Sequence, residues 1–300
     1  MNAKVFSLVC AISCSVIWGT SFVAQDMGMD YIGPFTFTSA RMFLGFITLL
    51  PFFFIFELKK VKETNLNLKI IIGYLLLLGF FLAGGNIFQQ VSLLYTDVAN
   101  SAIFTVLYVV IVPIIAYFLF SKNIHRSVWV AVFMCLIGGL LLSELDNLRM
   151  RYGDSLVIVG AFFWAFHIVY ISKFLKIFDF PVTIATFQCL FGAMFSFIPA
   201  SAFEYISLQV LIMEGRELLY AGVLSSGIAF LLQVYGQQNL PPAPIAIIFS
   251  LEGVFGPIAA WIILDQYLNE FKILGIVIIL LAVIFSQLVP MYDKRKYGRH

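Results

Sequence analysis

The amino-acid sequence predicts an all-α integral membrane protein with ten transmembrane helices, arranged as two inverted five-helix repeats with both termini in the cytoplasm. Three observations lead to this prediction: a very apolar composition, segments of the first half that recur in the second, and basic residues concentrated in alternate loops. Hydrophobic residues make up 62% of the chain, charged residues make up 11%, and the mean hydropathy is +1.00. These values lie far outside the range of soluble domains.

The apolar stretches account for nearly the whole chain. A hydrocarbon core about 30 Å thick needs about 20 apolar residues per helix. We predict spans at residues 5–24, 34–56, 70–93, 98–120, 128–143, 156–171, 181–201, 218–237, 243–264 and 271–289. The first span follows Lys4, as a signal peptide would, but it is long enough to cross the membrane and no clear small-residue cleavage site follows it. We therefore interpret it as the first helix.

Basic residues indicate the orientation. If the N-terminus is cytoplasmic, the internal basic residues are Lys4, Lys59, Lys60, Lys62, Lys69, Lys122, Arg126, Lys173, Lys176, Lys294, Arg295, Lys296 and Arg299. The external ones are only Arg149, Arg151, Arg216 and Lys272. This asymmetry follows the positive-inside rule and predicts a multi-pass protein of the cytoplasmic membrane. Membrane lipids are its expected surroundings, and no nucleic-acid partner is predicted.

The two halves of the chain share sequence patterns. The second span begins PFTFTSARMFLG and the seventh begins PVTIATFQCLFG, which pairs Pro34 with Pro181 and Arg41 with Gln188 at a shift of 147. The fourth and ninth spans align at a shift of 144, through Ala102/Ala246, Ile103/Ile247, Leu107/Leu251, Val110/Val254, Pro113/Pro257, Ile114/Ile258 and Ala116/Ala260. We predict repeats at residues 1–146 and 147–300. Because each has an odd number of helices, the second enters the membrane from the opposite side, as in many carriers that work by alternating access.

Glu252 is an acid in the middle of an apolar span, and the alignment pairs it with Tyr108. Both lie about ten residues into their spans, near the bilayer midplane. A carboxylate at this depth is costly and normally faces the bundle interior or an aqueous cavity. We expect Glu252 to carry a coupling proton or to hold a substrate amine. The alternative is a neutral acid that is hydrogen-bonded to neighbouring helices.

Arg41 lies seven residues after Pro34 in the second span. It keeps its charge under ordinary conditions, and its planar guanidinium suits the two-pronged binding of a carboxylate or phosphate. We expect it to anchor an anionic group of the substrate. The alternative is a structural arginine that reaches toward the interface or pairs with Asp26, Asp30 or backbone carbonyls.

Further polar and aromatic residues in the spans are candidates to line a substrate cavity. The predicted substrate-binding set is completed by His167, Tyr108, Gln188, Trp18, Thr20, Gln89 and Phe249. Further polar or aromatic residues within the spans are Asn86, Gln90, Gln233, Trp164 and Tyr235. For the polar residues the alternative is hydrogen bonding between helices, and for the aromatic residues it is packing or an interfacial belt.

A bend is predicted in the ninth span. Gly253 and Pro257 can bend the helix beside Glu252, and Gly256 and Pro113 complete the predicted hinge. Close packing of helices through small residues is the alternative for the glycines.

The sequence lacks the motifs of several kinds of catalytic, nucleotide-binding and metal-binding site. The sequence has no GxxxxGK[ST] phosphate loop, and its three histidines, His125, His167 and His300, are too scattered for a metal site. The four cysteines lie within spans and form no CxxC motif. We predict no enzyme, no cofactor and no metal.

Five segments resemble the ten-helix EamA group of the drug/metabolite transporter superfamily. They are IWGTSFVAQ (17–25), SARMFLG (39–45), LYVVIVPIIAYFLF (107–120), AFHIVYISKF (165–174) and IFSLEGVFGPIAAWIIL (248–264). The resemblance implies paired inverted repeats, a central cavity lined by both halves, and export of small metabolites, amino acids among them. In that group a Glu-Pro pair often stands where Glu252 and Gly253 stand, and a Gly-Glu pair commonly closes the ninth helix, where this chain has Asp265 and Gln266.

We therefore expect a secondary transporter that exports a small metabolite, such as an amino acid or a derivative, by alternating access around a central cavity. Two alternatives remain open: a flippase for a lipid-linked or amphiphilic substrate, and a membrane scaffold or sensor that transports nothing.

Overall fold

A computed structural model describes residues 2–64, 67–120, 124–142, 151–265 and 267–297, and for Ala99 and residues 290–297 it describes the backbone alone. The described chain is built from helices, with no strand among these residues. Nine of its helical segments are long and apolar enough to cross a membrane, and α7, with 17 residues, is a shorter apolar helix. The protein is therefore an all-helical, multi-pass membrane protein.

The elements follow one another along the chain as α1 (Ala3–Met27), α2 (Pro34–Phe52), the π-helical segment η1 (Phe53–Glu57), α3 (Leu58–Glu63), α4 (Leu68–Ser92), α5 (Val98–Thr105), α6 (Tyr108–Phe120), α7 (Arg126–Leu142), α8 (Tyr152–Phe174), α9 (Pro181–Phe203), α10 (Leu208–Met213), α11 (Gly215–Leu219), the π-helical segment η3 (Tyr220–Ile228), α12 (Ala229–Asn239), α13 (Pro242–Phe249), α14 (Glu252–Leu264) and α15 (Glu270–Tyr297).

Some residues and boundaries named in the sequence predictions are not among those that the structure describes. The repeat boundary at 146/147, Lys122, Arg149, Gln266, Arg299 and His300 lie outside the described residues, and the side chains of Lys294, Arg295 and Lys296 are not described.

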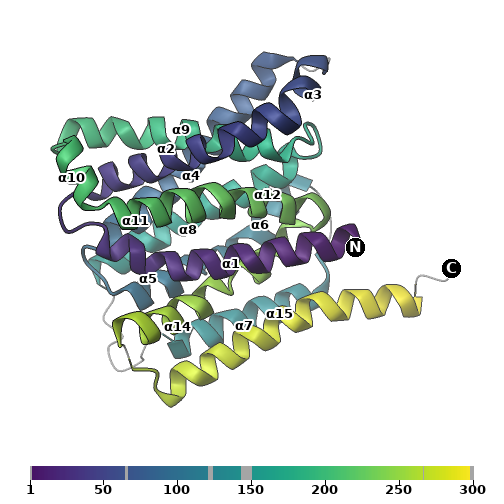
Figure 1. Cartoon of the computed structure of the whole chain (residues 1–300). Coiled ribbons are helices and arrows are strands. Elements are labelled where there is room, and N and C mark those ends of the chain that lie inside the picture. The colour runs from purple at the N-terminus through teal and green to yellow at the C-terminus, as the bar shows by residue number, and fades with distance from the viewer. Residues whose placement is uncertain (1, 65–66, 121–123, 143–150, 266, 298–300) are drawn as a thin grey trace.

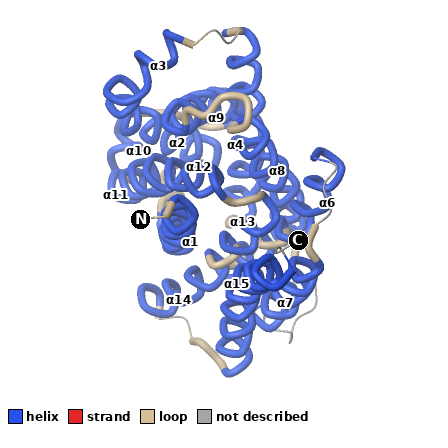
Figure 2. Tube along the Cα trace, turned by 90° about the vertical axis from the view of Figure 1, so that its right-hand side faces the viewer, coloured by secondary structure: helices blue, strands red, loops and turns tan. Residues whose placement is uncertain are grey.

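The helices run side by side as one bundle (Figure 1). α1 begins and α15 ends at the same end of this bundle, which we call the N-terminal face, and we call the other end the opposite face. Figure 2 looks onto the N-terminal face. α2, η1 and α3 form one helical segment from Pro34 to Glu63, so this segment extends past the predicted end at residue 56. The extension is rich in charged residues and has no helix-breaking residue, so the helix can continue into water.

Two predicted spans are broken in the middle. The predicted spans at residues 98–120 and 243–264 correspond to the apolar helical segments Asn100–Phe120 and Pro242–Leu264, and each is interrupted: α5 and α6 are separated by Val106 and Leu107, and α13 and α14 by Ser250 and Leu251. The two breaks lie at the same place in the repeat, at the shift of 144 found in the sequence. Tyr108 and Glu252 therefore become the first residues of their half-helices.

The backbone tightens in the same way at both breaks, through hydrogen bonds between residues three apart. In the first half these are Leu107 N–H to Phe104 O (3.1 Å), Val109 to Val106 (2.9 Å) and Val110 to Leu107 (3.1 Å); in the second half they are Leu251 to Ile248 (3.1 Å), Gly253 to Ser250 (3.0 Å) and Val254 to Leu251 (2.9 Å). At the second break the Ser250 hydroxyl donates to the Ile247 carbonyl (2.6 Å), and the Ser15 hydroxyl of α1 donates to the Ile248 carbonyl (3.1 Å). Side-chain hydroxyls thus satisfy carbonyls at the break.

The broken helices pack against each other across the two halves. α5 contacts α14 while α13 contacts α6, so each half-helix contacts the non-equivalent half-helix of the other repeat. In the same way, the contact of α1 with α12 corresponds to the contact of α8 with α4 in the other arrangement of halves. Two further contacts join equivalent helices directly: α2 packs against α9, and α7 packs against α15. The contacts therefore keep their pattern when each helix is replaced by its counterpart in the other half.

Two buried or half-buried carboxylates cap helices of the other half. Glu57, at the end of η1, caps α9, and Glu204, just after α9, caps α2; the two positions differ by 147. Glu57 accepts hydrogen bonds from the N–H groups of Val182 (3.1 Å) and Thr183 (2.7 Å) and from the Thr183 hydroxyl (2.7 Å), and Glu204 accepts them from the N–H groups of Phe35 (2.9 Å) and Thr36 (2.6 Å). A carboxylate at a helix N-terminus satisfies free N–H groups and interacts favourably with the helix dipole. These caps join α2 to α9 at both faces of the bundle.

The contact between α7 and α15 is closest at a pair of glycines, and this gives a stability prediction. A Cβ at Gly275 would lie 2.5 Å from the carbonyl oxygen of Gly138, whereas a Cβ at Gly73 in α4 would meet nothing within 4 Å. We expect Gly275→Ala to lower the thermal unfolding midpoint of the purified protein by several degrees, because the two backbones must separate. Gly73→Ala should leave the midpoint unchanged or raise it, because alanine favours the helix by about 1 kcal/mol. Equal midpoints for the two variants would contradict this reading of the contact.

Candidate functional site

A cavity lies in the interior of the bundle, where the two halves meet. Its described lining comprises Trp18, Ser21, Phe22, Gln25, Arg41, Asn86, Gln89, Tyr108, Trp164, Ile168, Ser225, Phe230, Gln233 and Glu252. These residues come from α1, α2, α4, α6, α8, η3, α12 and α14. The free space holds about one water molecule, so a metabolite can occupy this site only if helices move apart.

Arg41 lies on the polar side of this central cavity and is held by amide oxygens. Its Nη2 donates hydrogen bonds to Gln25 Oε1 (3.2 Å) and to Asn86 Oδ1. Gln89 Nε2 donates to the same Gln25 oxygen (3.2 Å), and Gln25 Nε2 donates to Ser21 Oγ (3.1 Å). Gln25 therefore orients the arginine and joins α1, α2 and α4 around it.

Among the described residues, the charge of Arg41 has no counter-ion. Only 2% of the residue is exposed, its Nε has no hydrogen-bond partner, and in the described part of the chain no carboxylate lies within salt-bridge distance of it. Its observed partners are thus neutral amides, not Asp26 or Asp30. A buried charge normally requires a partner, and a guanidinium at a cavity wall can obtain one from an anionic ligand.

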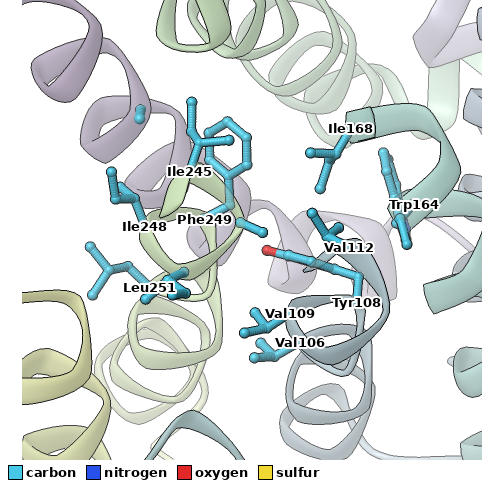
Figure 3. Packing of buried hydrophobic residues seen from close by; sticks show 14 of the residues in the cluster. Val106, Tyr108, Val109, Val112, Trp164, Ile168, Ile245, Ile248, Phe249 and Leu251 are labelled. Atoms are coloured by element: carbon cyan, nitrogen blue, oxygen red, sulfur yellow. The ribbon is translucent and has the colours of Figure 1, made fainter. Parts of the chain in front are cut away.

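Glu252 and Tyr108 line the cavity from the two helix breaks. Glu252 is 5% exposed and begins α14, where the positive end of the helix dipole favours an anion. Tyr108 is 2% exposed, and its hydroxyl lies close to the Glu252 carboxyl, with which it interacts. Figure 3 shows the ring of Tyr108 extending from α6 toward the segment that carries Phe249. An acid and a phenol at this position can bind an amine or exchange a proton.

Aromatic rings form the apolar side of the cavity. The ring centroid of Trp18 lies 5.4 Å from that of Phe230 and 6.1 Å from that of Trp164. The indole N–H of Trp164 is buried without a partner, so it is a free donor for a ligand. The cavity thus has one cation, one acid, several amides and an aromatic wall.

Of the nine predicted substrate-binding residues, the structure brings five to the cavity wall and leaves four elsewhere. Trp18, Arg41, Gln89, Tyr108 and Glu252 belong to the described lining; Thr20, His167, Gln188 and Phe249 do not. His167 and Gln188 are both fully buried and bond to each other through Nε2 and Oε1 at 3.0 Å.

The other two residues contact neighbouring helices. The hydroxyl of Thr20 is 2.6 Å from that of Tyr220. The ring of Phe249 packs behind Trp18, with its centroid 5.4 Å away.

Six residues of the described lining were not predicted from the sequence: Ser21, Phe22, Gln25, Ile168, Ser225 and Phe230. For α1 a signal was present: Trp18, Ser21, Phe22 and Gln25 recur at offsets of three, four and seven residues, which places them on one helix face. Ser225 and Phe230 carry no comparable pattern in the sequence.

The predicted hinge residues lie beside the helix breaks. A Cβ at Gly253 would lie 2.8 Å from a methyl of Val106, and a Cβ at Gly256 would lie 3.2 Å from Ala102 Cβ. Both glycines thus permit α14 to approach α5 closely. Pro113 and Pro257 lie inside α6 and α14, on the C-terminal side of the two breaks.

A second, larger cavity lies at the N-terminal face, and we call it the vestibule. It is lined by Ala116, Phe120, Ile124, His125, Val128, Ser172, Leu175, Lys176, Asp179, Gln237, Gln238, Asn239, Leu240, Pro241, Pro242, Ala243 and Pro244. Ile168 of α8 and Gln233 of α12 line the central cavity, and Ser172 and Gln237, four residues further along each helix, line the vestibule. The two cavities are therefore separated by about 6 Å along these helices.

The described residues contain no group of three or more His, Cys, Asp or Glu side chains placed to hold a metal ion. The four cysteines are free and buried.

Comparisons with known proteins agree with a transport role. The chain matches the sequence profile of the EamA-like transporter family at residues 5–144 and again at residues 151–288. An uncharacterized transporter of Archaeoglobus fulgidus is 27% identical over 278 residues, which are 91% of this chain and 83% of that protein. The uncharacterized transporter YoaV of Bacillus subtilis is 22% identical over 95% of this chain and 97% of its own length.

A solved crystal structure has the same fold. It superposes with a TM-score of 0.76 over 94% of this chain and 98% of that chain, at 15% sequence identity.

Proposed function

Because this chain belongs to the EamA-like transporter family, we propose that it is a secondary transporter that moves a small metabolite by alternating access around the central cavity. The family and the apolar helices make it a multi-pass transporter of the cell membrane. The names of its relatives are those of transporters and not of enzymes. Direction, mechanism and substrate are the parts that we infer.

Two inverted repeats, at residues 1–146 and 147–300, are the basis of the proposed mechanism. Support comes from the two family matches, the sequence shifts of 147 and 144, the equivalent helix breaks and the reciprocal packing of the halves. The shared end of α1 and α15 agrees with an even number of crossings (Figure 1). In such a scaffold, broken helices at the midplane surround the substrate, and movement between the repeats exposes the site to each side in turn.

The N-terminal face is assigned to the cytoplasm, because most basic loop residues of the sequence belong to this side under the positive-inside rule. The vestibule is then the cytoplasmic entrance to the central cavity. An entrance on this side fits export, in which substrate enters from the cytoplasm.

The substrate is inferred from the groups that line the cavity. Arg41 is a buried cation without a counter-ion in the part of the chain that the structure describes, and it lines the same small cavity as the acid Glu252. This single observation carries the proposal. A zwitterion such as an amino acid offers a carboxylate for Arg41 and an amine for Glu252, and its side chain would contact the aromatic wall. Glu252 could in turn take up the coupling proton when the amine leaves.

Ligand-dependent thermal stability tests this proposal, because a ligand that binds the native state raises its stability. The purified protein should be screened against amino acids, nucleobases and vitamins, with the decarboxylated and deaminated analogues of each amino acid as matched controls. We expect one or more amino acids to raise the unfolding midpoint by several degrees, and both analogues to raise it less. Stabilisation by nucleobases or vitamins alone would overturn the substrate class.

A further inference from the structure

Gln90 and Gln237 hold together helices that otherwise barely touch, one on each side of the central cavity. α1 packs along α12, and α4 packs along α8, so these four helices form two pairs. Between the pairs, α8 and α12 touch only briefly, and α1 and α4 touch still less. The central cavity lies between the pairs, because all four helices contribute to its lining.

Gln237 bridges the two pairs on the side of the vestibule. Its Nε2 donates hydrogen bonds to the Ile168 carbonyl (2.7 Å) and to the Ser172 hydroxyl (2.8 Å), which joins α12 to α8. Ile168 lines the central cavity, and Ser172 and Gln237 line the vestibule. These bonds therefore lie where residues of the central cavity and of the vestibule adjoin along α8 and α12.

Gln90 makes the equivalent bridge on the other side. Its Nε2 donates to the carbonyl of Gln25 at 2.7 Å, which joins α4 to α1 near the opposite face, beside the longer bond from Gln89 Nε2 to the Gln25 side chain (3.2 Å). Gln90 and Gln237 differ by 147 positions, and so do their partners Gln25 and Ser172. The sequence alone does not assign a function to this pair of glutamines, because their equivalence depends on which helices their amides join.

The second polar atom of each glutamine is left without a partner. Gln90 is 0% exposed and Gln237 is 3% exposed, and the Oε1 atom of each is buried with no hydrogen-bond partner. Buried polar atoms in native proteins nearly always have partners. An opened passage would supply one, because water or substrate could then reach the amide oxygen.

The contact between α2 and α9 is stabilised differently from the contacts that Gln90 and Gln237 bridge. The caps made by Glu57 and Glu204 use carboxylates, each with at least two N–H donors, at both faces. Hydrogen bonds to a charged group are about twice as strong as those between neutral groups. The neutral amide bridges are thus the weaker joints, and their loss separates helices that have few other contacts.

We propose that Gln90 and Gln237 are the gate residues of the transporter: release of Gln237 joins the central cavity to the vestibule, and release of Gln90 opens it to the opposite face. α2 and α9 stay together in both states. This inference rests on the alternating access of the proposed function, and it assigns the two moving joints within it.

A reporter thiol in the central cavity tests the gates without a known substrate. Ser21 lines this cavity, so Ser21→Cys is labelled by a membrane-impermeant methanethiosulfonate only from a face to which the cavity is open. The rate is measured in right-side-out and in inside-out vesicles, relative to the same protein with Ser21 intact. Gln90→Met and Gln237→Met are added separately, because methionine has nearly the same volume and no amide donor.

We expect Gln237→Met to increase labelling from the N-terminal face by about tenfold relative to labelling from the opposite face, and Gln90→Met to shift this ratio in the other direction. Gln209→Met is the matched control, since Gln209 is an exposed residue of α10 that belongs to the lining of neither cavity. The control should leave the ratio unchanged. A monodisperse elution profile for each variant verifies that it has folded.

Two results would overturn the inference, and they differ in what else they overturn. If the thiol labels from both faces and the ratio does not respond to Gln90→Met and Gln237→Met, or responds to both in one direction, the gate assignment alone is wrong. If the thiol labels from neither face in any variant, the gate assignment and alternating access are both wrong.

Discussion

Replacement of Arg41 by glutamine is expected to weaken binding of the amino acid found in the ligand screen by at least about 100-fold. The reason is that a substrate carboxylate loses two charge-assisted hydrogen bonds, each with a contribution of about 1.5–3 kcal/mol. Arg41→Lys should weaken binding less, because it keeps the charge but loses the planar, two-pronged geometry. Affinities would be measured by titration of the purified variants, with unfolding midpoints taken in parallel to establish that each is folded.

The matched control for Arg41 is Arg151→Gln. Arg151 is an exposed arginine that pairs with Asp97, away from the described cavity lining. Its removal should leave affinity unchanged, because exposed ion pairs contribute little. If Arg41→Gln binds the amino acid as tightly as the parent does, Arg41 is a structural residue and the carboxylate has another partner.

The repeat could be predicted from the sequence because its signals are local. Prolines and small residues recur at fixed shifts, and this was enough to pair Tyr108 with Glu252 and to place both at mid-depth. The structure puts both in the lining of the central cavity, each as the first residue of a half-helix. The type of most elements was also predictable, since span length and hydropathy determine which segments can cross a membrane.

The positions of the breaks in the fourth and ninth spans could not be predicted in this way, although Gly253 and Pro257 predicted a bend beside Glu252. An apolar run reads as a continuous helix, and the groups that make an interruption tolerable come from distant parts of the chain. The hydroxyl of Ser15, 233 residues from its partner Ile248, is an example. Only the packed structure shows that such a donor is present.

The capping carboxylates show a different limit. Glu57 and Glu204 differ by the same 147 positions as the prolines, so the signal was present in the sequence. A charged residue at the end of an apolar run reads as a membrane boundary, however, and the sequence does not say which helix it reaches. Gln25 could not be predicted as a site residue for a similar reason, because its role depends on Arg41 and Gln89, which come from two other helices.

Glu252→Gln is expected to abolish transport driven by a pH gradient, to the background of empty liposomes, while exchange of substrate across the membrane without a gradient continues. Glutamine resembles the protonated acid in shape and polarity but cannot release a proton, so the variant can bind and reorient but cannot couple the two movements. The measurement is uptake of the labelled amino acid into proteoliposomes, with and without an imposed pH gradient. Tyr108→Phe should retain coupling, because the carboxyl is still present.

Glu63→Gln is the matched control, because Glu63 is an exposed acid at the end of α3, beyond the predicted end of the second span at residue 56. Its proteoliposomes should respond to the gradient as the parent does. Loss of both exchange and gradient-driven uptake in Glu252→Gln would mean that a neutral amide cannot replace the carboxylate in binding the substrate amine, which would contradict the expected separation of binding from coupling. Retention of both would remove Glu252 from the mechanism, and the buried acid would be a structural group that a neutral amide can replace.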